Sequence, residues 1–273
     1  MIDVAQSRFA PSGKRARLGP VRDTLALCGR NLTVLYRVPR LLVFSTIQPL
    51  VFVFLFRYVF SGVASLATPG VPYVDYLMPG VFVQVAVFGA MNTAIGLAAD
   101  LRGGLLERFG ALPMTRAAVL AGRTLADLAR NVLVVSLMAG VGFALGFRTH
   151  LGAGPFIAGM LLVLLFGFAM SWIFAVVGLA VGDPESAQAA AFPVMAPLVF
   201  ASAAFIPVET MPTWLQGFAR HQPVSVTASA VRALVLGGPT STYVWQSLAW
   251  FVGIVAVFAP LGALLYRHAV QGR

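Results

Sequence analysis

Six stretches of the chain are apolar on every side, and each is long enough to cross roughly 30 Å of hydrocarbon. They cover residues 41–60, 77–99, 131–147, 156–181, 187–206 and 244–266. None shows the alternating pattern of about ten residues that a strand of an outer-membrane barrel requires. Because hydrocarbon supplies no partner for backbone N–H and C=O groups, such stretches must be helical. We therefore predict an all-α, polytopic membrane protein with six transmembrane helices.

The overall composition excludes a soluble enzyme or a nucleic-acid-binding protein. Hydrophobic residues make up 59% of the chain and charged residues 10%, against about 45 to 50% apolar and about 25% charged in soluble domains. The net charge of +10 reports orientation, since fifteen of the nineteen Lys and Arg residues lie before the first stretch, between the second and third, or after the last. Basic loops stay in the cytoplasm, so both termini are predicted to be cytoplasmic.

Residues 1–40 form a polar, basic arm without the apolar core of a secretory signal peptide. Within it, residues 20–40 favour an amphipathic helix that lies in the headgroup layer and ends at Pro39. Its apolar face carries residues spaced by three and four positions: Val21, Leu25, Cys28, Leu32 and Leu35. Two interpretations stay open: a plain membrane anchor, and an anchor that also contacts a cytoplasmic subunit.

Catalytic and metal-binding patterns are not found. Lys14 follows Gly13, but the residues around it do not form a phosphate-binding loop, because Arg15 replaces the hydroxyl residue that should follow the lysine. His150 and His221 are predicted on one side of the membrane and His268 on the other, so they do not form one metal or catalytic site. No carboxylate falls in the middle of a predicted span, which disfavours a proton-driven carrier. We expect no catalytic residue, metal or cofactor in this chain.

The cytoplasmic segment 100–116, DLRGGLLERFGALPMTR, stands out between the second and third spans. Its glycines and Pro113 bracket a short run whose apolar residues repeat at helical spacing, which predicts a short helix across the membrane plane. These apolar residues have little room to pack on the bundle unless another protein covers them. The alternative is that the helix packs on its own bundle.

The run LRGGLLERFGALPMTRAAVLAGRTLADL resembles the coupling segment of ABC-2 type exporter permeases, although Phe109 stands where the family favours leucine. The runs FIPVETMPTWLQGFARHQPVS and AVRALVLGGP resemble the daunorubicin-resistance branch of this family. The resemblance covers the whole chain, with a domain of residues 41–273 after the basic arm.

The resemblance implies two permease subunits, identical or different, that pair in the membrane, each with a separate ABC ATP-binding subunit. That partner would bind ATP and Mg and carry out hydrolysis. The residues implied to dock into it are Leu105, Leu106, Glu107, Arg108, Phe109, Leu112 and Pro113. Leu and Phe would supply packing, and the two charged residues would set the orientation at the rim.

Residues 207–239 are too polar and too rich in proline to cross the membrane. They contain two predicted short helices, 212–219 and 224–236, which resemble the re-entrant pair that caps the exit in this family. Trp214 and Phe218 suit an interfacial depth, either as plain anchors or as part of the exit. Gln48, Gln84 and Asn92 lie within spans, where they either line a translocation path or bond helix to helix.

The sequence thus predicts a non-catalytic permease subunit of the bacterial cytoplasmic membrane. It would export an amphipathic or hydrophobic compound, such as a drug, polyketide or lipid, by an ATP-driven mechanism. An ion-coupled secondary transporter or channel that works without an ATPase is the alternative. A membrane enzyme or a scaffold is a weaker one, because no convergent polar constellation supports catalysis.

Overall fold

The computed structural model describes residues 39–60, 62, 70–103 and 116–271, and within these ranges the regular secondary structure is entirely helical. The helices are α2 (Pro39–Phe54) with the π-helix η1 (Leu55–Val59), α4 (Tyr73–Arg102), α6 (Arg116–Ala144), α7 (Ala153–Val181), α8 (Pro184–Phe200), the 3-10 turn η2 (Val208–Thr210), α9 (Thr213–His221), α10 (Pro223–Leu236) and α11 (Thr240–Gln271). The predicted amphipathic helix up to Val38 and the core of the coupling segment lie outside the described residues.

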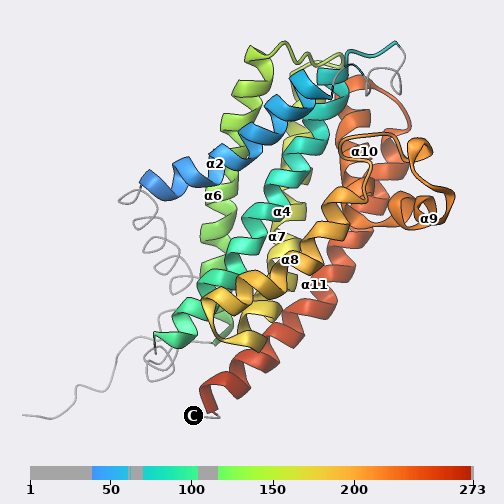
Figure 1. The fold of residues 1–273 in the computed structure, drawn as a ribbon. Coiled ribbons are helices and arrows are strands. Elements are labelled where there is room, and N and C mark those ends of the chain that lie inside the picture. Colours follow the sequence, from blue (N-terminus) through green and yellow to red (C-terminus); the bar gives the residue numbers. More distant parts are fainter. Residues whose placement is uncertain (1–38, 61, 63–69, 104–115, 272–273) are drawn as a thin grey trace, which may run out of the picture.

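Helix α4 forms the centre of the bundle, with α6, α7, α8 and α10 packed around it (Figure 1). In its most apolar part, 72% of the residues are buried, compared with 11% in α11. α11 packs mainly on α7 and α10, and the other helices leave most of its surface uncovered. That surface is rich in large apolar side chains such as Trp245, Val252 and Val257, as expected of a helix that faces lipid.

In the part of the chain that the structure describes, four helical segments are long and apolar enough to span a membrane: Tyr73–Arg102, Asp127–Ala144, Ala153–Val181 and Thr240–His268. They contain the predicted spans 77–99, 156–181 and 244–266 and most of 131–147. The other two predicted spans fall on shorter helices, α2 with η1 and α8. The structure therefore supports a polytopic membrane protein with at least these four candidate spans.

The predicted span 187–206 is helical only as far as Phe200. Beyond that point, serine hydroxyls replace helical carbonyls as the hydrogen-bond partners of backbone N–H groups. The Ser225 hydroxyl accepts from the Ala203 N–H at 2.9 Å, and the Ser202 hydroxyl accepts from the Ala204 N–H at 3.2 Å. Such side-chain bonds offer the backbone an alternative to the helix. The span 131–147 likewise ends early, at Ala144, before a turn at Gly146.

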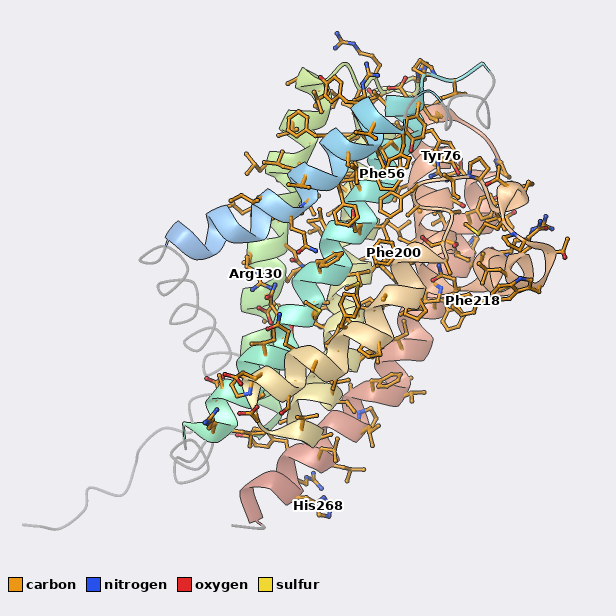
Figure 2. The ribbon with its side chains drawn as sticks, in the orientation of Figure 1. Phe56, Tyr76, Arg130, Phe200, Phe218 and His268 are labelled. Atoms are coloured by element: carbon orange, nitrogen blue, oxygen red, sulfur yellow. The ribbon has the colours of Figure 1, made fainter. Side chains whose placement is uncertain are left out.

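Close contacts between helices depend on two glycines. A Cβ on Gly178 of α7 would overlap the Ala94 carbonyl of α4, and a Cβ on Gly80 of α4 would overlap the Ala204 carbonyl. Aromatic rings join α2 and η1 to α8 and to the segment after it: Phe52 packs on Phe200 with ring centroids 6.1 Å apart, and Phe56 stacks on Phe205 at 4.5 Å. Figure 2 labels Phe56 and Phe200.

Candidate functional site

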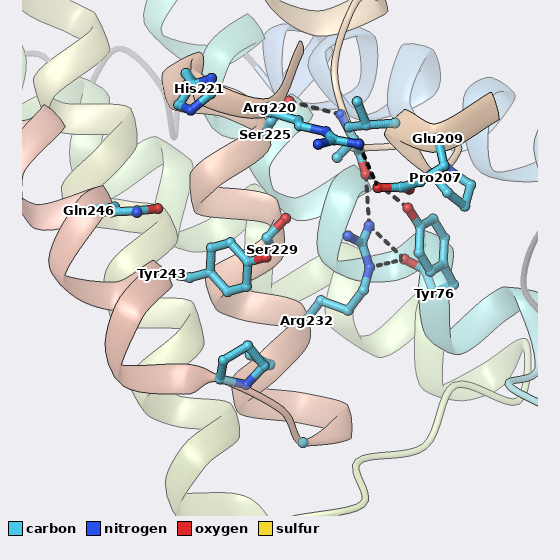
Figure 3. Close-up of a pocket in the computed structure, with 15 residues that line it drawn as sticks. Tyr76, Pro207, Glu209, Arg220, His221, Ser225, Ser229, Arg232, Tyr243 and Gln246 are labelled. Atoms are coloured by element: carbon cyan, nitrogen blue, oxygen red, sulfur yellow. Dashed lines mark hydrogen bonds and ion pairs between the residues drawn. The ribbon is translucent and has the colours of Figure 1, made fainter. Parts of the chain in front are cut away.

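A polar cavity of about 560 Å³ opens between the start of α4, the α8–α9 connection, α10 and α11 (Figure 3). It lies toward the end of the bundle opposite the C-terminus. Its volume falls in the range of small-molecule sites. Residues from all four regions line it, among them Tyr76, Pro207, Glu209, Arg220, His221, Ser225, Ser229, Arg232, Tyr243 and Gln246.

The two predicted short helices beside this cavity are present as α9 and α10. Pro223 occupies the first turn of α10, where its missing N–H costs nothing, and the Gln222 side chain accepts from the Val224 N–H at 3.0 Å. The Trp250 indole N–H donates to the His221 carbonyl at 3.0 Å. Because Trp250 lies about 15 Å along α11 from its start, the α9–α10 junction sits beside the body of a candidate span and not at its end.

α4 and the α8–α9 connection form one wall of this cavity, and Arg232 of α10 lies against that wall. Its guanidinium donates to the Tyr76 carbonyl at 3.2 Å and to the Ala203 carbonyl at 2.9 Å. Its central carbon also lies 3.7 Å from the centre of the Tyr76 ring, a close cation–π contact. These partners orient the cation but carry no net negative charge. No ion pair joins Arg232 to an acidic residue in the described ranges.

Polar groups of α10 and α11 face the same cavity. The Ser225 hydroxyl is already engaged with the Ala203 N–H. The side chains of Ser229, Tyr243 and Gln246 line the cavity and make no hydrogen bond to any other described residue. Arg220 and Glu209 form a loose ion pair at the rim, 3.7 Å apart and exposed. The cavity therefore combines one oriented cation with unused hydroxyl and amide groups.

Sequence analysis assigned Arg232 to no site. Its signal was an arginine near the end of an otherwise apolar segment, 223–236. Its partner Tyr76 stands 156 positions away, and no local pattern indicates that pairing. Tyr243 and Ser229 were missed for the same reason, because isolated hydroxyl residues in apolar helices are common.

The residues predicted for a translocation path lie in different surroundings. Gln48 is exposed on α2, whereas Gln84 is fully buried on α4, and neither of its amide atoms has a hydrogen-bond partner among the described residues. Asn92 donates to the Phe88 carbonyl of its own helix at 3.1 Å. Trp214 and Phe218 are exposed on α9, and neither lines the cavity (Figure 2).

A buried polar network lies deeper, between α4 and α6. Asp127 is 4% exposed and pairs with Arg130 at 3.3 Å, and the Arg130 guanidinium also donates to the Gly89 carbonyl at 2.6 Å. The two charged residues stand three positions apart on α6, a spacing that brings side chains together on one helix face. Thr93 of α4 joins the network, since its hydroxyl donates to Asp127.

At the other end of the bundle, Arg102 at the end of α4 pairs with Asp183 at 2.6 Å. Asp183 caps α8, since its carboxylate accepts from the Ser186 N–H at 3.0 Å. The seven residues predicted to dock into an ATP-binding subunit, from Leu105 to Pro113, follow α4 in the sequence and lie outside the described residues. Their role stays a prediction.

The three histidines lie in three different surroundings. His150 contacts the buried Asp75 carboxylate at 3.3 Å, His221 lines the cavity, and His268 lies near the opposite end of the bundle. In the described part of the chain, no three His, Cys, Asp or Glu side chains are grouped as metal ligands.

Comparison with known proteins decides the family. The model of the ABC-2 type transporter family matches residues 22–236, most of the chain and both flanks of the predicted coupling segment. The chain belongs to the ABC-2 type transporter family. Among curated relatives, daunorubicin resistance ABC transporter permease protein DrrB1 of Streptomyces coeruleorubidus is 36% identical over 94% of this chain and 90% of its own length. Probable doxorubicin resistance ABC transporter permease protein DrrC of Mycobacterium tuberculosis is 30% identical over 98% and 96%.

This ABC-2 permease is thus a transport subunit of an ABC exporter. In such systems separate subunits hydrolyse ATP, so the permease is not itself an enzyme. The cavity and the buried network therefore belong to a transport protein. We interpret them by the molecules they could bind and the helices they connect, and not as catalytic centres.

Proposed function

We propose that the permease exports an amphipathic or hydrophobic small molecule or lipid across the bacterial cytoplasmic membrane, powered by an ABC ATP-binding subunit. The observation that carries this proposal is the family match over residues 22–236, together with near-full-length similarity to proteins named as drug resistance permeases. Apolar surfaces on α2, α7 and α11 suit a substrate that travels in contact with lipid.

The coupling segment between α4 and α6 would transmit the power stroke. Both flanking helices are tied together by the Arg130–Gly89 and Thr93–Asp127 hydrogen bonds, so a push on the segment would move them as one unit. Phe109 would insert into a groove of the ATP-binding subunit, which holds ATP and Mg. A second permease subunit, identical or different, would complete the pathway.

The coupling proposal is tested by Phe109→Asp in the full complex. A charge in the apolar contact should abolish co-purification of the ATP-binding subunit and vanadate-sensitive ATP hydrolysis. Leu151→Asp is the matched control, because it places the same charge on an exposed residue at the opposite end of the bundle. Unchanged co-purification and export in Phe109→Asp would refute the docking site. Uphill transport by the reconstituted permease alone would instead support an ion-coupled carrier.

We also propose six transmembrane helices with both termini in the cytoplasm. The supporting features are α2 with η1 and α8 as the two shorter spans, an even number of crossings and the basic residues of segments 1–40 and 100–116. Replacing the single cysteine, Cys28, allows a direct test. In a Cys28→Ser background, a membrane-impermeant maleimide should label Ser12→Cys of the basic arm in inverted vesicles only. In the same background, Ser241→Cys should be labelled in right-side-out vesicles only, and the reverse pattern would overturn the orientation.

A further inference from the structure

The cavity between α4, α10 and α11 holds a positive charge that the protein does not neutralise. Arg232 is held by neutral carbonyls and by the ring of Tyr76, and it forms no ion pair within the described ranges. At the rim, Glu209 and Arg220 offset each other. Among the residues that line the cavity, the balance is one net positive charge, so an anion is favoured there over a cation.

The remaining polar lining suits an oxyanion. Ser229 and Tyr243 present hydroxyl groups and Gln246 presents an amide, and each lacks a hydrogen-bond partner among the described residues. Hydroxyl and amide donors beside a guanidinium are the groups that bind phosphate and carboxylate oxygens in proteins. Figure 3 shows Tyr243 and Ser229 across the cavity from Tyr76, with Arg232 between them.

The position of the cavity indicates what else the ligand contains. The α9–α10 junction is bonded to Trp250, about 15 Å along a candidate membrane span. Apolar side chains, including Phe218 of α9 and Trp250 of α11, are exposed beside it. A ligand whose anionic head occupies the cavity could therefore keep its apolar tail against these surfaces and the lipid around them.

We propose that this cavity binds the phosphate or carboxylate head group of an anionic amphiphile, with Arg232 as the charge partner and Ser229 and Tyr243 as hydrogen-bond donors. The inference rests on the proposed export function and narrows its substrate class to anionic amphiphiles. It separates this permease from a carrier built for cationic drugs, because a protonated amine would meet the positive charge of Arg232, while the carboxylate that lines the cavity, Glu209, already pairs with Arg220.

Binding is measured with the full-length permease alone, in nanodiscs of zwitterionic lipid, by isothermal titration calorimetry. Because no ATP-binding subunit is present, the result is independent of coupling and export. The probe is dioctanoyl phosphatidate. The comparison ligands are dioctanoylglycerol, inorganic phosphate and the cationic dioctyldimethylammonium ion. Phosphatidate should bind at least tenfold more tightly than each of the three. If the diacylglycerol or the cation binds as tightly as phosphatidate, the site does not prefer anions. If inorganic phosphate binds as tightly, the site does not require the apolar part of the ligand.

Three variants test the residues. Tyr243→Phe and Ser229→Ala each remove a hydroxyl that bonds no described residue, and each should raise the Kd for phosphatidate by about 3- to 10-fold. Arg232→Gln should raise it by about 10- to 100-fold. Because Arg232 also holds backbone carbonyls and its loss can disturb folding, the two milder variants decide the outcome. Arg148→Gln removes a charge at the same end of the bundle, outside the cavity, and should leave the Kd unchanged. The site would be refuted if Arg148→Gln raised the Kd as much as the cavity variants, or if neither Tyr243→Phe nor Ser229→Ala changed the Kd.

Discussion

The Thr93 hydroxyl of α4 donates a 2.6 Å hydrogen bond to the Asp127 carboxylate of α6. Asp127 also pairs with Arg130, which in turn bonds the Gly89 carbonyl of α4. Thr93 lies about 14 Å along the helix axis from the last residue of α4, so the network lies well inside the bundle. It joins the two helices that flank the predicted coupling segment, at a depth where water does not compete for the bonds.

Asp127→Ala should destabilise the permease by about 3 to 5 kcal/mol, because it removes the buried carboxylate that pairs with Arg130 and accepts the Thr93 hydrogen bond. Thr93→Val should cost less, about 1 to 3 kcal/mol, since it removes one neutral donor from that carboxylate. The measurement is thermal or denaturant unfolding in nanodiscs. Glu209→Gln breaks the exposed 3.7 Å pair with Arg220 and should change stability by less than about 1 kcal/mol. Equal effects of Asp127→Ala and Glu209→Gln would contradict the network.

Gly178→Ala should destabilise the contact between α4 and α7 by about 1 to 3 kcal/mol, because the added methyl would overlap the Ala94 carbonyl and force the helices apart. Gly253→Ala is the matched control in α11, where nothing lies within 4 Å of the added Cβ. That change should be neutral or slightly stabilising, since alanine is the better helix former. Unfolding temperatures of the two variants in the same nanodiscs decide the matter, and a tolerant Gly178 would mean that the helices are not in close contact.

Trp250→Phe should loosen the α9–α10 junction, because it removes the 3.0 Å hydrogen bond from the indole to the His221 carbonyl. The expected loss of stability is about 0.5 to 1.5 kcal/mol. Faster amide exchange in the 213–222 segment should accompany it. Trp214→Phe makes the same chemical change at a residue that is 80% exposed and should alter neither quantity. If both substitutions act alike, the junction is not held by α11.

Acid should weaken the turn between α7 and α8. The pKa of the Asp183 carboxyl lies below its usual value, chiefly because the carboxylate accepts the Ser186 backbone hydrogen bond, with a further contribution from Arg102. A lowered folded-state pKa means that this stabilisation is complete at neutral pH and is lost as the pH falls through that pKa.

Hydrogen–deuterium exchange of the 182–190 segment, corrected for the intrinsic rate, should therefore show lower protection at about pH 3 than at neutral pH. Asp183→Asn keeps a capping side chain that does not titrate. Its protection in this segment should not depend on pH in the same range. A persistent acid response in Asp183→Asn would assign the effect to another group.

Much of the fold follows from local pattern. The spans 77–99, 156–181 and 244–266 lie within α4, α7 and α11, and the short helices 212–219 and 224–236 within one or two residues of α9 and α10. Helix ends were less predictable. The end of α8 at Phe200 depends on Ser225, which lies on another helix and accepts the Ala203 N–H. The coupling segment was recognised from its residues, and its docking role stays a prediction.

The sequence by itself determined that this protein is helical and belongs in a membrane, because long apolar stretches must satisfy their backbone hydrogen bonds internally wherever water is absent. Only the tertiary structure decided which polar groups meet. Arg232 reaches the carbonyl of Tyr76 across 156 positions and Thr93 reaches Asp127 across 34. Such pairings depend on which faces of the helices pack together, and in a bundle that is apolar on nearly every side no hydrophobic periodicity records those faces.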